Sequence, residues 1–226
     1  SVTTSGTARE DEVLTASHTL ADEDGLGVIS WQWNRDSVAI DGATDSTYTL
    51  AQADVGAAMT VTANYTDGEG TVESVTSAPT AVVENISHSP TGSVIISGTA
   101  REDEVLTASH TLSDEDGLGV MNWQWSRDGV VLDGATNSTY TLVQADVGAA
   151  MTVTASYVDG EGTSESVTSS ATGLVLNQND VPVGEVLVSQ FIKELVASST
   201  LTDEDGLGEI SWQWSRDGVA IGGATG

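Results

Sequence analysis

The sequence DEDGLGVISWQWNRD, residues 22–36, contains a motif that recurs along the chain and reveals how the chain is organised. The block DEDGLG, followed after three residues by WQW, begins at Asp22, Asp114 and Asp203. Trp31 and Trp123 lie 92 residues apart, and Trp123 and Trp212 lie 89 residues apart. Repeats of about 20 to 50 residues need neighbours to bury a core, whereas roughly 90 residues suffice for an independent small domain. The sequence therefore predicts a tandem array of small domains.

Apolar and polar residues alternate around this motif, which indicates half-buried strands rather than helices. Met59, Val61 and Ala63 share one face of a segment whose other face carries threonines, and Asp-Gly pairs such as Asp67-Gly68 supply turns between such runs. In the first copy, strands are expected at residues 2–8, 13–21, 28–34, 38–40, 47–50, 58–66 and 71–83, with one helical turn at 51–56. About seven short strands per copy predict an all-β fold of tandem immunoglobulin-like antiparallel β-sandwich domains, arranged head to tail.

The repeat places the domain boundaries. We expect immunoglobulin-like repeats at residues 1–85 and 86–178, and an incomplete third repeat at residues 179–226 that holds only the first four strands. Half a sandwich leaves apolar residues and strand edges uncovered. Residues 179–226 are therefore expected to be well ordered only when other sequence completes them.

The amino-acid composition restricts which partners the chain is expected to bind and what can reinforce its fold. The chain has 34 acidic residues against six basic ones, a formal net charge of −28, and no cysteine. Nucleic acids and anionic membranes need clustered Lys or Arg, so neither is an expected partner. Without disulfides or thiolate sites, core packing and oxygen-ligated cations remain to reinforce the fold. No signal peptide and no bilayer-spanning apolar run is recognisable, so we expect a soluble segment without membrane insertion.

Several motifs together carry a resemblance: DEDGLGxxxWQWxRDGVxI, GATxSTYTL, QADVGAAMTVTAxYxDGEGTxESVTS and the linker NQNDVP, residues 177–182. The chain resembles the tandem immunoglobulin-like and cadherin-like repeats of giant, type I-secreted bacterial surface adhesins, over nearly its whole length. The resemblance implies an extracellular, cell-surface location. The linker is similar to the calcium-binding linker N-x-N-D-x-P of cadherin-like repeats.

Acidic clusters are the candidate metal sites, because head-to-tail stacking of sandwiches brings the end loops of one copy towards the next. At the first junction the candidates are Glu10, Asp11, Asp54, Glu84, Asn85, Asp114, Asp116, Asp159 and Glu161. At the second they are Glu102, Asp103, Asp146, Asn177, Asn179, Asp180, Asp203 and Asp205. Calcium takes six to eight oxygen ligands, mostly carboxylates and carbonyls, so structural Ca²⁺ is the expected ion at one junction or more.

Other interpretations of these residues remain open. Asp and Glu in loops also form solvated turns, and a strongly acidic surface aids solubility, including solubility in salt. The tryptophan pairs suit sugar stacking, but Trp31 and Trp33 share a face with Ile29, which favours core packing. His18 and His110 are expected at the core or its rim rather than in a transition-metal site.

The functional expectation follows from the repeats and their resemblance. No Gly-x-Ser-x-Gly turn, P-loop or H-E-x-x-H motif is present, so we expect no enzyme. The favoured function is a structural or adhesive extender segment of a bacterial extracellular repeat protein, rigidified by calcium at its interdomain junctions. Its partners would be neighbouring repeats of the same chain, with host or matrix ligands reached through other domains. The alternative is an immunoglobulin-like module that recognises a glycan or a host surface protein.

Overall fold

The computed structural model describes residues 1–225 and shows an all-β protein built from antiparallel sheets and hairpins. Gly226, the last residue of the predicted third repeat, lies outside the described residues. Contacts divide the chain into two compact units. The first contains residues 1–92 with 112–120 and 157–165, and the second contains residues 93–111, 121–156 and the chain from 166 onwards. The three-repeat boundaries expected from the sequence stay a prediction.

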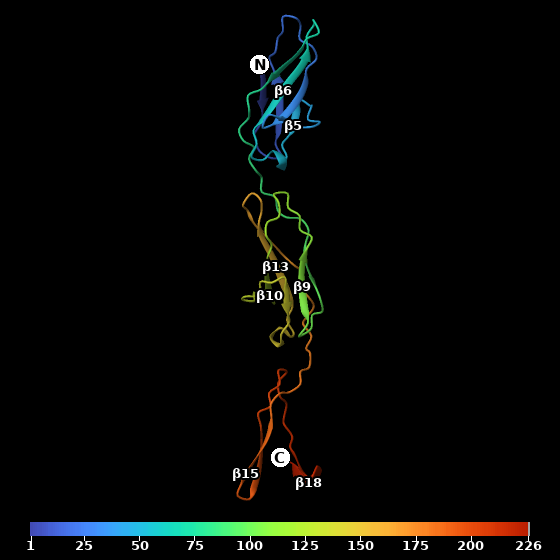
Figure 1. The fold of residues 1–226 in the computed structure, drawn as a ribbon, viewed down its shortest axis with the longest axis vertical. Helices are drawn as coiled ribbons and strands as arrows, with labels where there is room; N and C mark the ends of the chain where they lie inside the picture. Colours follow the sequence, from blue (N-terminus) through green and yellow to red (C-terminus); the bar gives the residue numbers. More distant parts are fainter. Residues whose placement is uncertain (226) are drawn as a thin grey trace. The chain divides into compact units, whose positions relative to one another are not determined.

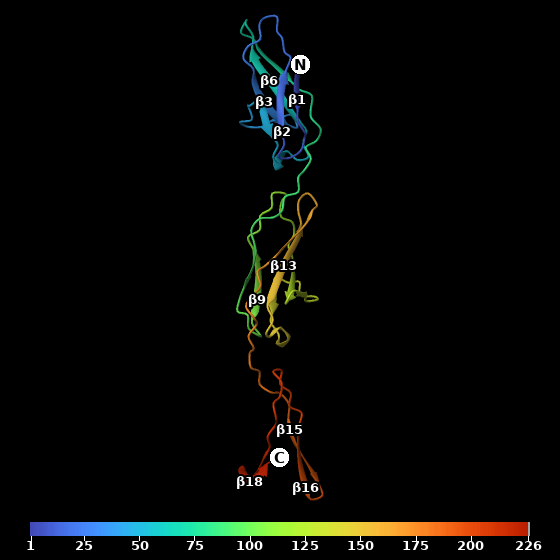
Figure 2. The ribbon, with the colours of Figure 1, turned by 180° about the vertical axis from the view of Figure 1, so that it is seen from behind.

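Two antiparallel sheets pack face to face in residues 1–84 and form a β-sandwich (Figures 1 and 2). One sheet has the order β1 (Val2–Ser5), β2 (Val13–His18), β5 (Thr47–Thr49). The other has the order β4 (Val38–Ala39), β3 (Ser30–Arg35), β6 (Met59–Thr66), β7 (Val72–Thr76). A short 3₁₀ helix, η1 (Gln52–Asp54), precedes β6. The expected all-β sandwich of short strands is confirmed.

The core of this sandwich follows the period-two pattern of the sequence. On β6, Met59, Val61 and Ala63 are fully buried, while the threonines between them are half-exposed. Trp33 pairs with Val61 across the sheet, is fully buried, and donates its indole N–H to the carbonyl oxygen of Asp45 at 2.9 Å. Burial of each large apolar side chain contributes about 1.5 to 3 kcal/mol, so these strands are held by their inward faces. The expected core role of the tryptophans is confirmed for Trp33.

Residues 94–168 repeat the strand order and register of the first copy. The sheets are β12 (Thr139–Thr141), β9 (Val105–His110), β8 (Val94–Ser97), and β11 (Val130–Val131), β10 (Asn122–Arg127), β13 (Met151–Val158), β14 (Ser164–Thr168), with η2 (Gln144–Asp146) before β13. Trp125 is buried as completely as Trp33 and donates to the carbonyl oxygen of Asn137 at 2.9 Å. Because the same residues recur, the same packing recurs.

The segment after β7 differs from the single long strand expected at residues 71–83. Regular pairing stops at Thr76, and beyond it the N–H groups of Ser77 and Thr80 donate to the carbonyl oxygens of Val61 and Met59 at 2.9 Å, before an isolated bridge joins Val82 to Ala58. Between these points the hydroxyls of Ser77 and Thr80 accept the N–H groups of Val61 and Met59 at 3.1 and 3.0 Å. Pro79 lacks an N–H and interrupts a ladder, so side-chain oxygens replace the backbone acceptors there.

The third copy forms two hairpins, β15 (Val186–Phe191) with β16 (Glu194–Ser199), and β17 (Gln213–Arg216) with β18 (Val219–Thr225). Its tryptophans, Trp212 and Trp214, are only half-buried. Among the described residues beyond Val175, no apolar side chain is fully buried. The apolar faces of this copy are therefore uncovered within residues 176–225.

Candidate functional site

The first candidate site begins with Glu10, which lies in the loop between β1 and β2. Its backbone N–H donates to the carbonyl oxygen of Glu84 at 2.9 Å, so the loop is tied to the chain that leaves the sandwich. Its carboxylate accepts the backbone N–H of Ile86 at 3.2 Å, and the residue is 1% exposed. Asp11 follows with a φ of 62°, a left-handed conformation that Asp tolerates better than most residues. This sharp turn directs Glu10 inwards.

Asp116 completes the site from the loop between β9 and β10. Its N–H donates to the carboxylate of Asp114 at 3.0 Å, and its own carboxylate accepts the backbone N–H of His88 at 2.5 Å. Glu10, His88 and Asp116 each bring one possible ligand atom to within 4.8 Å of the others. All three residues belong to the first compact unit. A loop, a linker and a second loop thus meet at one point.

The second unit repeats this arrangement with Glu102, Asp180 and Asp205, whose ligand atoms again lie within 4.8 Å of one another. The carboxylate of Glu102 accepts the N–H of Gln178 at 3.1 Å, and that of Asp205 accepts the N–H of Asp180 at 2.8 Å. Glu102 is 2% exposed, whereas Asp205 is exposed. The same backbone contacts therefore hold carboxylates together twice in the chain.

Electrostatics favour a cation at the second site. Partial desolvation, and then the negative charges of Asp103, Asp205 and Asp203, raise the pKa of Asp180 above its ordinary value. The three ligand candidates of this site are all carboxylates, so their ionised forms repel one another. A bound divalent cation would reverse this repulsion and supply the missing positive charge.

His88 is the member of the first site that was not predicted from the sequence. Its Nδ1 lies 3.7 Å from the carboxylate of Asp116, and its Nε2 lies 3.6 Å from Asp11 and 4.0 Å from Glu115. Desolvation lowers the pKa of His88, but the surrounding carboxylates, Glu10 first, outweigh this effect and raise it. The signal for His88 lies in the repeat: His88 and Asp180 are 92 residues apart, and each stands two residues before a proline.

Two predicted ligands, Asp54 and Asp146, lie in a different hydrogen-bond network. Asp54 is fully buried and binds Arg35 at 2.6 Å, the Tyr48 hydroxyl at 3.0 Å and the Ala51 N–H at 2.9 Å. Asp146 makes the same set of contacts with Arg127, Tyr140 and Val143. These carboxylates start the 3₁₀ helices and anchor them to the sheet. Neither belongs to the two groups of candidate ligands whose atoms lie within 4.8 Å of one another.

Asp114 and Asp159 support the loops of the first site. Asp114 accepts the Tyr157 hydroxyl at 2.5 Å, as Asp22 accepts that of Tyr65 at 2.9 Å in the first copy. Desolvation and this bond to Asp114 raise the pKa of Tyr157. Asp159 is 7% exposed, and its Oδ1 accepts the N–H groups of the following turn, while its Oδ2 is buried without a hydrogen-bond partner among the described residues.

The remaining candidates lie at the margins of the two sites. Exposed or half-exposed positions are occupied by Asp11, Glu84, Asn85 and Glu161 at the first site, and by Asp103, Asn177, Asn179 and Asp203 at the second. The backbone of Glu84 accepts the Glu10 N–H, and Asn177 accepts the side-chain amide of Gln144 at 3.4 Å. The sequence thus predicted five of the six clustered residues, together with these others, which belong to neither cluster.

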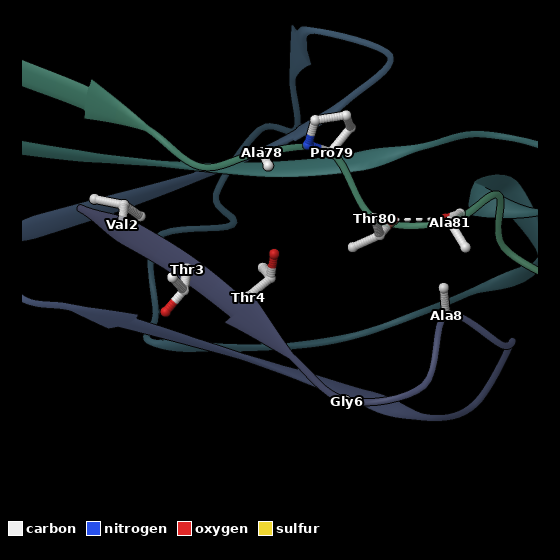
Figure 3. A pocket seen from close by; sticks show the side chains of 9 residues that line it. All are labelled: Val2, Thr3, Thr4, Gly6, Ala8, Ala78, Pro79, Thr80 and Ala81. Atoms are coloured by element: carbon white, nitrogen blue, oxygen red, sulfur yellow. Dashed lines mark hydrogen bonds between the residues drawn. The ribbon is translucent and has the colours of Figure 1, made fainter.

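A groove beside β1 is a second kind of candidate site (Figure 3). It has a volume of about 310 Å³ and lies between β1 and residues 78–81. Figure 3 shows small side chains along it, such as Thr4, Ala8 and Ala81. A similar groove lies between β8 and residues 170–172. Neither groove is lined by a charged or aromatic side chain, so neither offers the stacking surface or ion pair that usually anchors a specific ligand.

Comparison with protein-family models gives no match for this chain, and a search of curated proteins gives none either. Within residues 1–225, no helical segment combines the length and the apolar character needed to cross a membrane.

Proposed function

We propose that this chain is a structural, adhesive extender segment of a bacterial extracellular repeat protein, in which immunoglobulin-like copies follow one another and bound cations stiffen the joints. The observation that carries this proposal is the repeated site. A buried Glu, a linker residue and an Asp converge at Glu10, His88 and Asp116, and again at Glu102, Asp180 and Asp205. A site that recurs with the domain repeat suits a structural role in each joint better than a single active centre.

Calcium is the proposed structural cofactor, and the second site supports it most directly. Its three candidate ligands are carboxylates, and Asp103 and Asp203 add negative charge nearby. Calcium accepts six to eight oxygen ligands at 2.3 to 2.6 Å in flexible geometry, whereas magnesium requires a near-ideal octahedron and keeps much of its water. Loops and linkers that carry carboxylates and free carbonyls therefore suit the larger ion.

An extender function also agrees with the uniformity of the copies. The first two have the same strand order, core residues and site contacts. Partners would be the neighbouring repeats of the same chain, with surface ligands bound by other domains. The alternative is a module that binds a glycan or a host protein, and the linings of the two grooves beside β1 and β8, without charged or aromatic side chains, give it little support. Specific binding of the chain in a glycan array would favour the ligand-binding module over the extender segment.

Thermal unfolding tests the calcium proposal. We expect Ca²⁺ to raise the melting temperature of the chain and Mg²⁺ to raise it much less. One site with a dissociation constant near ~0.1 mM would add about 2.7 kcal/mol at ~10 mM Ca²⁺. Asp205→Asn should reduce the calcium effect, whereas Asp217→Asn, which removes an exposed turn carboxylate outside the site, should not. Unchanged melting after chelation at constant ionic strength would contradict the proposal.

A further inference from the structure

The two candidate cation sites differ at one ligand position. Glu10 corresponds to Glu102, and Asp116 corresponds to Asp205 in the repeated DEDGLG block. Their linker members make the same backbone contact, since the N–H of His88 donates to Asp116 and the N–H of Asp180 donates to Asp205. The side chain on that shared backbone is an imidazole in the first site and a carboxylate in the second.

The imidazole of His88 is oriented so that one ring nitrogen could bind a metal ion beside Asp116. Its Nδ1 is buried, faces the inner carboxylate of Asp116 at 3.7 Å, and makes no hydrogen bond among the described residues. Its Nε2 faces the outer carboxylates of Asp11 and Glu115. A histidine that binds a metal through one ring nitrogen commonly directs the other towards a carboxylate, which fixes the ring and increases its basicity.

The chemistry of this donor set differs from that of calcium. Calcium and magnesium take oxygen ligands, whereas neutral imidazole with carboxylates suits zinc and its neighbours in the first transition series. Glu10 and Asp116 are at most 4% exposed, so their charges are shielded little by water. A divalent ion at Nδ1 would balance both charges and give the buried nitrogen a partner.

We propose that the first site, formed by Glu10, His88 and Asp116, takes a transition-metal dication of the zinc type, while the second, formed by Glu102, Asp180 and Asp205, takes calcium. This inference rests on the proposed cation sites at the joints. Adjacent joints of one chain then respond to different ions, and the residue at the position of His88 and Asp180 sets the preference.

A competing explanation needs no metal. A protonated His88 would neutralise the nearby carboxylates through ion pairs with Asp11, Glu115 and Asp116. In that case an Nδ1–H would find an acceptor in Asp116, yet Nδ1 makes no hydrogen bond among the described residues. Binding of a metal to the site separates the two explanations, because a protonated imidazole cannot be a ligand.

A reciprocal exchange of the two residues tests the proposal in the full chain. All variants are made in a chain that also carries His18→Ser and His110→Ser, so that His88 is its single histidine. Serine is chosen because the third copy has Ser199 at the position of His18 and His110. Zinc and calcium binding are measured by calorimetry near pH 7.5, with Co²⁺ absorption and the His88 ring proton signal as probes of direct ligation. Near-ultraviolet circular dichroism of the tryptophans checks that each variant folds.

The expected results have opposite signs in the two variants. His88→Asp should weaken zinc binding by more than about 100-fold, because the loss of supporting residues alone costs about 10- to 100-fold. The same variant should gain a calcium site, and Asp180→His should gain a zinc site and lose calcium. The assignment would be overturned if the parent chain did not bind zinc. It would also be overturned if folded His88→Asp kept its zinc affinity, or if Asp180→His gained no zinc site. Loss of calcium binding in Asp205→Asn tests the calcium proposal for the second site separately. The calcium proposal and the zinc proposal can therefore fail independently of each other.

Discussion

At the scale of single residues, the buried acids of this protein are of two kinds. Asp54 has Arg35 beside it, and this hydrogen bond raises the pKa of the Arg35 guanidinium, so the negative charge is balanced within the sandwich. Glu10, in contrast, lies in a cluster with Asp116 and His88. Both Asp54 and Glu10 lie in segments between strands. Their surroundings separate a structural ion pair from a candidate metal ligand.

Asp54→Asn is expected to destabilise the first sandwich without changing its response to cations. The variant leaves Arg35 without its charged partner and weakens the contacts to Tyr48 and the start of η1. Loss of one partner of a buried pair costs about 3 to 5 kcal/mol, and the partial exposure of Arg35 reduces the expected value to about 2 to 4 kcal/mol. Urea unfolding with and without Ca²⁺ measures both effects.

Asp45→Asn is the matched control for this prediction, because Asp45 is exposed and its backbone carbonyl, which binds Trp33, is retained. We expect a change within about 0.5 kcal/mol for that control. A calcium response that disappears in Asp54→Asn, with the fold intact, would show that Asp54 is a ligand as the sequence predicted.

At the scale of elements, the DEDGLG loop is shaped by its close approach to the end of a neighbouring strand. A side chain at Gly27 would collide with the carbonyl oxygen of Thr66, and one at Gly119 with that of Val158. These glycines lie where the loop passes the end of β6 or β13. The contact holds the loop against the sheet. It therefore positions Asp116, which stands three residues before Gly119.

Gly119→Ala should lower the free energy of unfolding of the second copy by about 1 to 3 kcal/mol, because the backbone of β13 must shift to admit the methyl group. The same substitution at Gly208, the equivalent position of the third copy, should change stability by less than about 0.5 kcal/mol, since nothing lies within 4 Å of its added carbon. Equal effects of the two variants in denaturant unfolding would show that the loop does not depend on this contact.

At the scale of the whole molecule, the two sites are expected to act independently, because each lies inside one compact unit. The linkers are tied down by the N–H groups of His88 and Asp180, which donate to Asp116 and Asp205. A cation at either site should reinforce only the linker beside it. The molecule would then stiffen joint by joint rather than in a single transition.

Hydrogen exchange of the two linkers measures this independence. Chelation should accelerate exchange in residues 85–90 and 177–182, and restored cations should slow it. Asp205→Asn should abolish the cation effect in 177–182 and leave that in 85–90 unchanged. A loss of protection in both linkers would indicate coupling between the joints.

The repeat, most of the strands and five of the six clustered residues could be predicted from the sequence alone. Period-two alternation placed β6 within one residue of its observed start, because side chains of a strand point alternately inwards and outwards. The repeated DEDGLG block also marked Asp116 and Asp205 as candidate ligands, since loop acids that recur with a domain occupy equivalent places in each copy.

The grouping of the acids, in contrast, is visible only in the folded chain. Asp54 and Glu10 both lie in segments between strands, but the first pairs with Arg35 and the second accepts the N–H of Ile86 in the linker. His88 was overlooked because a lone histidine in a linker has no local pattern, and its partners come from loops far away in the chain. Local periodicity is a property of neighbouring residues, whereas a ligand set is a property of distant segments brought together by folding. For that reason the sandwich could be predicted from the sequence, whereas the folded chain showed which candidate ligands lie together.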